Sequence, residues 1–288
     1  MTMSHMLYSS AVDAVSIAVP TIYHRAAAEP LLNAGVACLI EKPLAESAKE
    51  AEAIKQAAEK SGAVLMVGHI ERFNPVMRAM QKSTSGGREI IPRFIQVHRV
   101  SPMTFRSVDV GVVMDMMIHD LDVVLMLMGG QEPDEVRASG VAVITDHEDI
   151  CNAWLTFKRP YGTCVANVSA SRLALKTERV TRITGENGYV KIDYATKTGT
   201  VIRRRANELQ MREIREQIRQ GADLTNLKWH ELINVEPLAI DDGEPIVLEI
   251  QSFLHAVKTG ARPAIDADAG FANVRTAERI VQEIKRRW

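Results

Sequence analysis

The sequence has 288 residues, which is enough for one large domain or two ordinary ones. Hydrophobic residues make up 46% and charged residues 25%, and 35 Lys and Arg face 36 Asp and Glu, a balance typical of a globular protein. A net charge of −1 provides no whole-molecule field that would hold DNA, RNA or an anionic membrane. The composition therefore argues against a nucleic-acid binder and favours a small-molecule partner.

The cysteines and the N-terminus bear on redox state and location. Cys38, Cys151 and Cys164 lie far apart, form no CxxC pair and are odd in number, which argues against a disulfide framework and a zinc site. The chain does not open with a basic stretch followed by an apolar core, and no window approaches 18 uninterrupted apolar residues. We expect a cytoplasmic protein that is neither exported nor membrane-spanning.

Strand and helix patterns alternate in the first quarter of the chain. Short apolar runs typical of parallel strands buried on both faces occupy residues 12–20, 36–40 and 64–69, and helical patterns occupy 24–34 and 45–60. Gly35 and Ser61-Gly62 mark the helix ends. Because β-α-β units join by right-handed crossovers, the pattern predicts an α/β fold over residues 1–74, a partial Rossmann-like dinucleotide-binding domain with a parallel sheet.

From residue 90 onward, alternating runs bounded by Gly, Asn and Asp predict mostly antiparallel strands. These strands are expected at 93–100, 135–144, 151–157, 163–169, 179–184, 189–193 and 200–204, with a hairpin turn at 185–188 and helices at 77–82, 112–128, 247–259 and 267–287. We therefore expect residues 75–288 to form an α+β domain for substrate binding and oligomerisation. Its centre is one large, open, mostly antiparallel sheet, and its final helix packs back on the first domain.

The triplet Glu41-Lys42-Pro43 follows the second predicted strand, at the edge where open α/β sheets bind ligands. A lysine there can hydrogen-bond a hydroxyl that is becoming a carbonyl, and partial burial would lower its pKa toward acid/base use. The alternative is a solvated lysine in a helix-initiating turn, with Pro43 as the first helical residue. The tripeptide alone favours this second interpretation.

Asp115, His119 and Asp122 have the spacing i, i+4, i+7 in the long predicted helix, so they project from one face of it. The other faces are apolar, which argues against a merely solvent-exposed polar face. A carboxylate one turn from a histidine can fix its tautomer and stabilise its protonated form, which suits acid/base catalysis. Two alternatives stay open: an acidic helical turn with an incidental histidine, and a zinc or iron site, although no HExxH or CxxC motif supports the latter.

Two shorter segments follow the first and third predicted strands. Residues 20–24 close the first strand, where they line a cofactor site or cap the next helix through Thr21. Residues 68–75 end the third strand, and Arg72 there is suited to binding a phosphate or carboxylate, or to pairing with Glu71.

Taken together, these segments resemble the glucose-fructose oxidoreductase, inositol dehydrogenase and rhizopine catabolism (Gfo/Idh/MocA) family of NAD(P)-dependent sugar and cyclitol dehydrogenases. The resemblance implies a hydride transfer between NAD or NADP and a ring hydroxyl of a carbohydrate substrate. It implies Lys42, Asp115 and His119 as catalytic residues, Pro20, His24, Glu41 and Lys42 at the cofactor, and Arg72, Asn74 and Asp122 at the substrate. The run 68–75 is similar to the subset of the family that acts on nucleotide-linked amino sugars.

The sequence departs from this family in one respect. None of its 17 glycines belongs to a GxGxxG turn or to a GxxxxGK[ST] loop, and the chain resembles the family from its fourth strand onward. We expect the N-terminal half of the dinucleotide-binding domain to be missing, through an incomplete gene model or a loss in evolution. The strand at 12–19 would then have an unpaired edge, and a non-catalytic binding or oligomerisation protein becomes the alternative function.

The second domain offers many strands but few helices, so one face of its sheet is expected to lack a cover within the chain. Two identical faces can cover each other, and two-fold dimers are the commonest symmetric assembly. We therefore expect a homodimer or homotetramer that forms through the C-terminal sheet.

Overall fold

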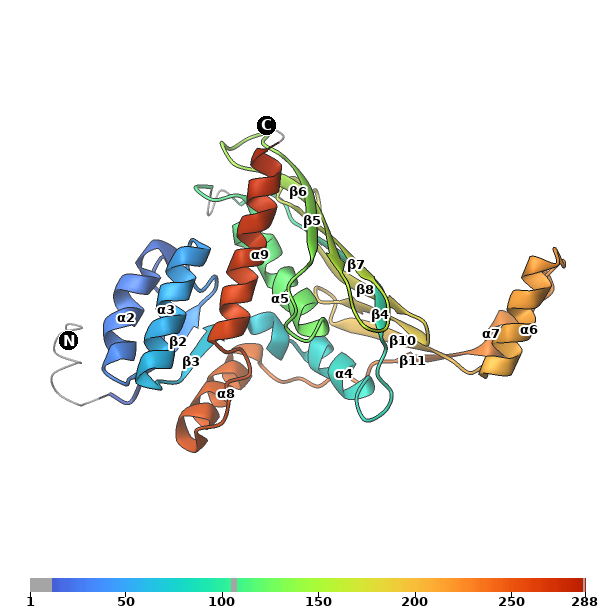
Figure 1. Cartoon of the computed structure of the whole chain (residues 1–288), viewed down its shortest axis with the longest axis horizontal. Coiled ribbons are helices and arrows are strands. Elements are labelled where there is room, and N and C mark those ends of the chain that lie inside the picture. Colours follow the sequence, from blue (N-terminus) through green and yellow to red (C-terminus); the bar gives the residue numbers. More distant parts are fainter. Residues whose placement is uncertain (1–11, 105–107, 287) are drawn as a thin grey trace.

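The structure, a computed structural model, describes residues 12–104, 108–286 and 288 (Figure 1). Within these residues the backbone forms a three-stranded parallel sheet followed by an eight-stranded mixed sheet. This is the predicted α/β arrangement followed by α+β; positions 1–11 and 287 of the predicted elements lie outside the described residues. None of the helices in the described part combines the length and apolarity that a bilayer crossing requires.

The N-terminal sheet has the order β1-β2-β3, and both strand pairs are parallel. Its strands are β1 (Ala14–Ile17), β2 (Ala37–Glu41) and β3 (Leu65–Gly68), and the segments between them contain η1 (Thr21–Tyr23), α2 (His24–Asn33) and α3 (Ala48–Ser61). Apolar side chains of the strands and helices, including Leu39, Ile40 and Ile54, are buried together in one core. The predicted β-α-β-α-β order is confirmed.

β1 is the edge of this sheet. Among the described residues it pairs with β2 alone, so the unpaired edge expected for this strand is present. Ile17 is buried but Ser16 is exposed, and the prediction of a strand buried on both faces is therefore wrong for β1. The physical reason is the edge position, since no described strand lies against its outer side.

α3 begins three residues later than predicted, because Ser47 and not Pro43 marks its start. The Ser47 Oγ accepts a hydrogen bond from the backbone N–H of Glu50 at 3.3 Å, as an N-cap does. At the other end Gly62 adopts φ 71°, which a glycine reaches without steric cost. The interpretation of Pro43 as the first helical residue is wrong.

The C-terminal sheet has the order β11-β10-β9-β8-β4-β7-β6-β5. Its strands are β4 (Pro92–Val100), β5 (Glu135–Val141), β6 (Ile150–Phe157), β7 (Cys164–Ser171), β8 (Glu178–Gly185), β9 (Gly188–Asp193), β10 (Thr198–Arg204) and β11 (Ile233–Pro237). In the described part of this sheet only the β4–β7 pair is parallel, and the other neighbouring strands are antiparallel. The predicted hairpin at 185–188 joins β8 to β9.

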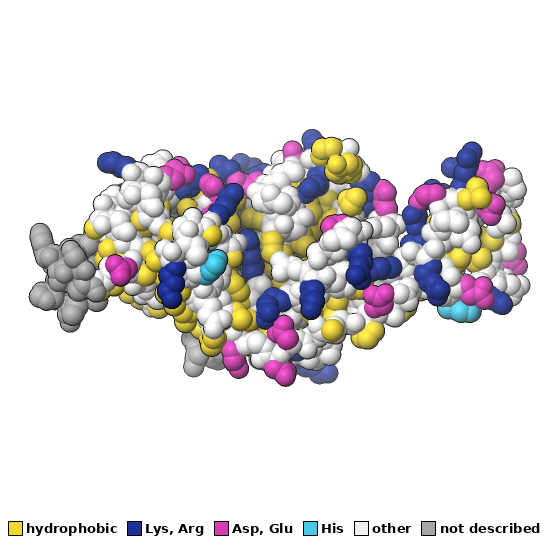
Figure 2. Space-filling view, turned by 90° about the horizontal axis from the view of Figure 1, so that it is seen from below, with side chains coloured by type: hydrophobic (Ala, Val, Ile, Leu, Met, Phe, Trp, Pro, Cys, Tyr) yellow, Lys and Arg dark blue, Asp and Glu magenta, His cyan; other side chains and the backbone are white. Residues whose placement is uncertain are grey.

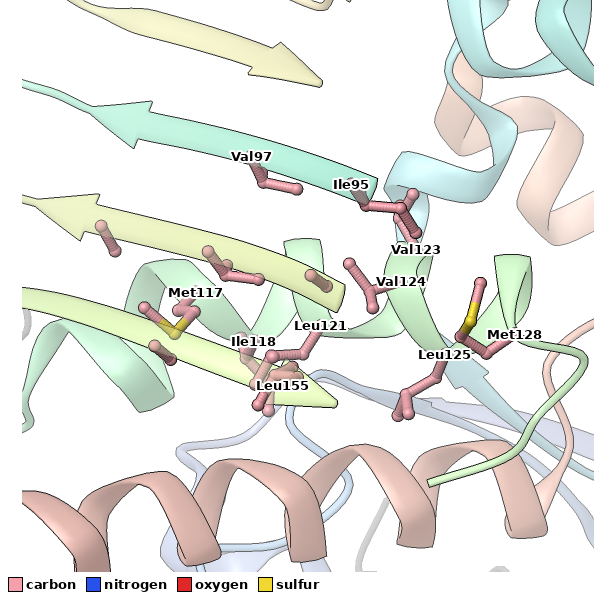
Figure 3. Close-up of a cluster of buried hydrophobic side chains, with 14 of the residues drawn as sticks. Ile95, Val97, Met117, Ile118, Leu121, Val123, Val124, Leu125, Met128 and Leu155 are labelled. Atoms are coloured by element: carbon pink, nitrogen blue, oxygen red, sulfur yellow. The ribbon is translucent and has the colours of Figure 1, made fainter. Parts of the chain in front are cut away.

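Helices cover one face of this sheet and leave the other open (Figure 1). These segments are α4 (Pro75–Ser83), the π-helical turn η3 (Val113–Met117), α5 (Ile118–Leu127) and α9 (Ala267–Lys285), whereas α8 (Pro245–Thr259) contributes Phe253 to the core of the first sheet. Figure 3 shows Ile95 and Leu155 from two strands beside the apolar side chains of α5. On the opposite side of β6, Trp154 is 47% exposed. Successive side chains along the strand thus point alternately to the covered face and to the open face, as expected for a sheet that is covered on one side.

α9 connects the two halves of the molecule. It packs against α3 and β3 on one side and against α5 and β5 on the other. Val274 belongs to the core of the first sheet, and Ile280 to that of the second. The carboxyl ends of the first sheet are thereby held against the helix-covered side of the second.

The segment 208–237 was not predicted, and it contains α6 (Glu208–Arg219), α7 (Trp229–Leu232) and the edge strand β11. α6 and α7 project away from the body of the molecule (Figure 1). Asn207 and Gln210 form a reciprocal capping box with two 2.9 Å hydrogen bonds, a sequence signal that could have indicated α6. Figure 2 shows apolar side chains among the charges of this projection, where Leu209 and Trp229 are 66% and 56% exposed.

Candidate active site

A pocket lies where the carboxyl end of β2 meets β4, β8 and the helix that starts with η3. The segment 100–104 and Met116 form part of its lining, and its described ionisable side chains are Lys42, Arg99, Asp115, His119, Arg172 and Arg179. The structure thus brings together the three side chains that the family resemblance implies as catalytic. They come from β2 and the η3–α5 helix, which are distant in the sequence.

Lys42 enters the pocket from the end of β2. Its Nζ donates a 3.0 Å hydrogen bond to the backbone carbonyl of Asp115. Partial burial lowers the pKa of Lys42, while the Asp115 carboxylate acts in the opposite direction. The side chain is held by the protein, so the interpretation of Lys42 as a solvated lysine in a helix-initiating turn is wrong.

The helix that carries Asp115 and His119 does not have α-helical geometry throughout. Its first part, Val113–Met117, is a π-helical turn that contains Asp115, whereas His119 and Asp122 both lie in α5. Asp115 and His119 line the pocket, but the Asp122 carboxylate instead accepts two hydrogen bonds from Arg72, at 2.6 and 2.7 Å. The prediction that all three side chains share one functional face is therefore wrong for Asp122.

His119 is partly buried, and its Nδ1 atom makes no hydrogen bond within the described chain. Burial lowers the pKa of His119 well below its ordinary value, and the charges of Lys42 and Arg99 lower it further. The imidazole is therefore neutral at pH 7 and able to accept a proton. The predicted hydrogen bond through which Asp115 would orient this ring is not found at Nδ1.

Behind the pocket lies a buried ionic network that the sequence interpretation missed. The Arg99 guanidinium donates to both oxygens of Asp120, at 2.7 and 3.0 Å, and to Glu71 at 3.0 Å. All three residues are at most 6% exposed. The only sequence signal was a carboxylate on an otherwise apolar helix, next to the histidine.

Two of the residues that the resemblance places at the substrate are engaged inside the fold. Arg72 binds Asp122 and also donates to the backbone carbonyl of Ala264 at 3.2 Å. Asn74 caps α4, since its side-chain oxygen accepts from the Val76 N–H at 3.2 Å. Among the described lining residues of the pocket, none of Arg72, Asn74 and Asp122 occurs.

The residues expected at the cofactor lie along the carboxyl edge of the first sheet. Pro20 precedes η1, and the buried His24 ring lies 3.0 Å from the backbone carbonyls of both Val19 and Pro43. His24 thus ties the loop after β1 to the loop after β2. Glu41 ends β2, and its carboxylate accepts the N–H of Lys42 at 3.3 Å.

His69 directly follows β3 at the same edge and was not singled out from the sequence. It is 1% exposed, and neither ring nitrogen has a hydrogen-bond partner in the described residues. Burial lowers the pKa of His69, so the ring is neutral. A buried polar group without a partner is rare in native proteins and points to a role beyond packing.

The histidine and the carboxylates near the pocket do not form a metal centre. Across the described residues, no group of three or more His, Cys, Asp or Glu is arranged to hold a metal ion. Asp120 and Asp122 are instead bound by Arg99 and Arg72. The zinc or iron alternative therefore has no ligand cluster in this part of the chain.

Comparison with known proteins finds a matching family model in each of the two halves of the chain. A family model described as "Oxidoreductase family, NAD-binding Rossmann fold" matches residues 1–69, and one described as "GFO/IDH/MocA C-terminal domain" matches residues 96–191. UDP-N-acetylglucosamine 3-dehydrogenase of Acidithiobacillus ferrooxidans is 43% identical over 187 residues, which is 65% of this chain and 57% of that relative. Inositol 2-dehydrogenase of Rhizobium meliloti is 25% identical over 95% of this chain and 78% of its own length.

Solved structures agree with these matches. The structure of UDP-N-acetylglucosamine 3-dehydrogenase from Acidithiobacillus ferrooxidans aligns with 99% of this chain and 82% of its own, at 32% identity and a TM-score of 0.82. A levoglucosan dehydrogenase in complex with NADH shares the fold, at 17% identity and a TM-score of 0.78 over 98% of this chain and 80% of its own. The chain belongs to the Gfo/Idh/MocA family of oxidoreductases.

Proposed function

We propose that this protein transfers a hydride between NAD or NADP and a ring hydroxyl of a sugar, cyclitol or nucleotide sugar. The observation that carries the proposal is the convergence of Lys42 and His119 on one pocket at the carboxyl end of β2, the edge where open α/β sheets bind ligands. Within this range, the 43% identity to a UDP-N-acetylglucosamine 3-dehydrogenase supports a nucleotide-linked amino sugar.

The strand ends of the first sheet fit the nicotinamide end of such a cofactor. Val19, Ile22 and Tyr23 expose 41%, 62% and 55% of their surface beyond β1, which provides an apolar wall for a flat ring. The unpartnered His69 offers a buried hydrogen-bonding group at the same edge. When bound, the cofactor accepts or returns the hydride. The sequence contains no GxGxxG turn, so no residue present is assigned to the pyrophosphate.

Residues of the chain itself can take up the proton that the substrate hydroxyl loses. In the oxidative direction the substrate O–H bond breaks as the hydride leaves carbon, and the neutral imidazole of His119 takes the proton. Lys42 donates a hydrogen bond to the same oxygen and so stabilises the negative charge that develops there. The Asp115 backbone carbonyl holds the Lys42 ammonium in place from the other side.

Steady-state kinetics of Lys42→Ala and His119→Ala test this assignment. Each substitution is expected to lower kcat by about a hundredfold, the usual contribution of a positioned acid or base. Lys60→Ala, at an exposed lysine in the last turn of α3, is the matched control and is expected to leave kcat unchanged. Turnover close to wild type in both pocket variants would remove these residues from the mechanism.

A non-catalytic binding protein is the second candidate, favoured by the unpaired edge of β1 and the absence of a GxGxxG turn from the sequence. Calorimetric titration with NADH and NADPH separates the two candidates. Binding at millimolar cofactor supports the oxidoreductase, whereas a folded chain that binds neither cofactor supports the alternative.

We further propose a homodimer or homotetramer through the open face of the C-terminal sheet. Trp154 and Phe94 contact each other on this face, with ring centroids 6.1 Å apart and ring planes tilted by 50°, and Trp154 is 47% exposed. A partly exposed aromatic pair on an uncovered sheet is typical of an interface. Light scattering at tens of micromolar is expected to give at least twice the monomer mass, and Trp154→Lys is expected to reduce it; a monomeric wild type would contradict the proposal.

A further inference from the structure

Two arginines face each other on the pocket side of the C-terminal sheet. Arg99 of β4 and Arg179 of β8 are direct cross-strand partners in an antiparallel pair. Both belong to the pocket lining, so they lie on the same face. Like charges directly opposite on neighbouring strands repel each other, and such a pair persists only where negative charge offsets it.

The negative charge of the protein offsets one of these arginines and not the other. Arg99 holds both oxygens of Asp120 and one oxygen of Glu71. Arg179 has only Glu71 within ion-pair distance in the described chain, at 4.0 Å. That carboxylate already accepts from Arg99 at 3.0 Å and from Asn74 at 3.1 Å. Arg179 therefore keeps most of its hydrogen-bonding capacity, and its side chain is 46% exposed.

The rest of the pocket lining is also cationic. Lys42 and Arg172 add two positive charges, and Asp115 is the single carboxylate among the described lining residues. Arg172 donates to the Val110 carbonyl at 2.6 Å and lies 3.8 Å from Asp149, so it is held within the fold. A pocket with this balance attracts an anion, and Arg179 is the cation placed to meet it.

The geometry points to Arg179 as a specificity-determining residue that binds an anionic group, a phosphate or a carboxylate, carried by the substrate. This inference rests on the proposed function, because it names the chemical class of the substrate whose hydroxyl meets Lys42 and His119. A planar guanidinium matches two oxygens of either anion at once. The anion would also supply the negative charge that the Arg99–Arg179 pair lacks.

Calorimetric titrations of the full chain without cofactor test the inference independently of hydride transfer. The probes are UDP-N-acetylglucosamine for the phosphate source, glucuronate for the carboxylate source, and N-acetylglucosamine as the neutral sugar. We expect wild-type protein to bind at least one anionic probe more tightly than the neutral sugar, and Arg179→Gln to weaken that binding roughly ten- to a hundredfold. Whichever anionic probe responds identifies the source.

Two further variants keep the test decisive. Arg182→Gln is the matched control, since Arg182 lies on the same strand but on the opposite, open face, across from Gln96 and Lys191. It is expected to bind as wild type, and Arg179→Lys is expected to retain part of the affinity. The inference is overturned if wild-type protein binds neither anionic probe, or if Arg179→Gln weakens the neutral sugar as much as the anions. Failure of the proposed function would show separately, as absent cofactor binding and turnover.

Discussion

The two sides of the pocket satisfy their buried polar groups in opposite ways. Toward the C-terminal sheet, Arg99 of β4 is joined to Asp120 of α5 and to Glu71, which follows β3, by hydrogen bonds of 2.7 to 3.0 Å. On the side of the first sheet, neither nitrogen of His69 has a hydrogen-bond partner among the described residues, and the same holds for one oxygen of Glu249 in α8. All these residues are at most 6% exposed.

The ion pairs around Arg99 satisfy their buried charges, whereas His69 and Glu249 keep buried polar atoms without hydrogen bonds in the described chain. A buried ion pair contributes little net stability, but removing one partner is costly because the other remains charged and desolvated. A buried polar group without a partner already destabilises the fold, so removing it costs little or is favourable. Substitutions on the two sides should therefore have effects of opposite sign.

The largest effect is expected on the paired side. Arg99→Met leaves the carboxylates of Asp120 and Glu71 buried without their main cation, and we expect it to lower the free energy of unfolding by about 3–5 kcal/mol. Arg182→Met, on the open face of the same sheet, is expected to change it by less than about 0.5 kcal/mol. Urea denaturation monitored by circular dichroism measures both; similar values for the two variants would show that the network is not structural.

An intermediate effect is expected at Glu249 and depends on pH. Burial, followed by the charge of Glu41, raises the pKa of Glu249 to about 7. Between its ordinary pKa of 4.5 and about 7 the unfolded chain is ionised while the folded chain keeps the proton, so stability falls as the pH rises through this window.

Glu249→Gln mimics the protonated side chain at every pH. We expect the variant to match wild type near pH 4.5 and to be more stable by about 1–3 kcal/mol at pH 8. Denaturant unfolding at the two pH values measures the difference. A constant offset between the two proteins would contradict a raised pKa.

The fold and the main pocket residues could be predicted from the sequence because both depend on local signals. The apolar runs between Gly35 and Gly68 define two strands whatever their partners, and Lys42 and His119 belong to short motifs. The Arg99 network was not predictable in this way, since its three members come from segments that only the tertiary fold brings together. Nor does the side-chain pattern reveal the π-helical turn that carries Asp115, because that turn is a change in backbone hydrogen bonding. The pairing of Asp122 with Arg72 was hidden for the same reason as the Arg99 network, since the two residues lie far apart in the sequence.

The smallest effect is expected at His69, and it should have the sign opposite to that of Arg99. His69→Leu replaces an imidazole without hydrogen bonds by an apolar side chain, so we expect the free energy of unfolding at pH 7.5 to rise by about 1 kcal/mol.

The pH dependence sharpens this last prediction. Burial lowers the pKa of His69 in the folded protein, so the unfolded chain binds a proton first as the pH falls below the ordinary value of 6.5, and wild type loses stability there. His69→Leu removes this contribution, at most about 1.4 kcal/mol per pH unit, while His119 continues to provide its own. Unfolding measured at pH 7.5 and 5.5 should therefore show a larger advantage of the variant at pH 5.5. A variant that is less stable than wild type at both pH values would show that His69 packs or bonds in a way that stabilises the fold, and the contrast between the two sides of the pocket would not hold.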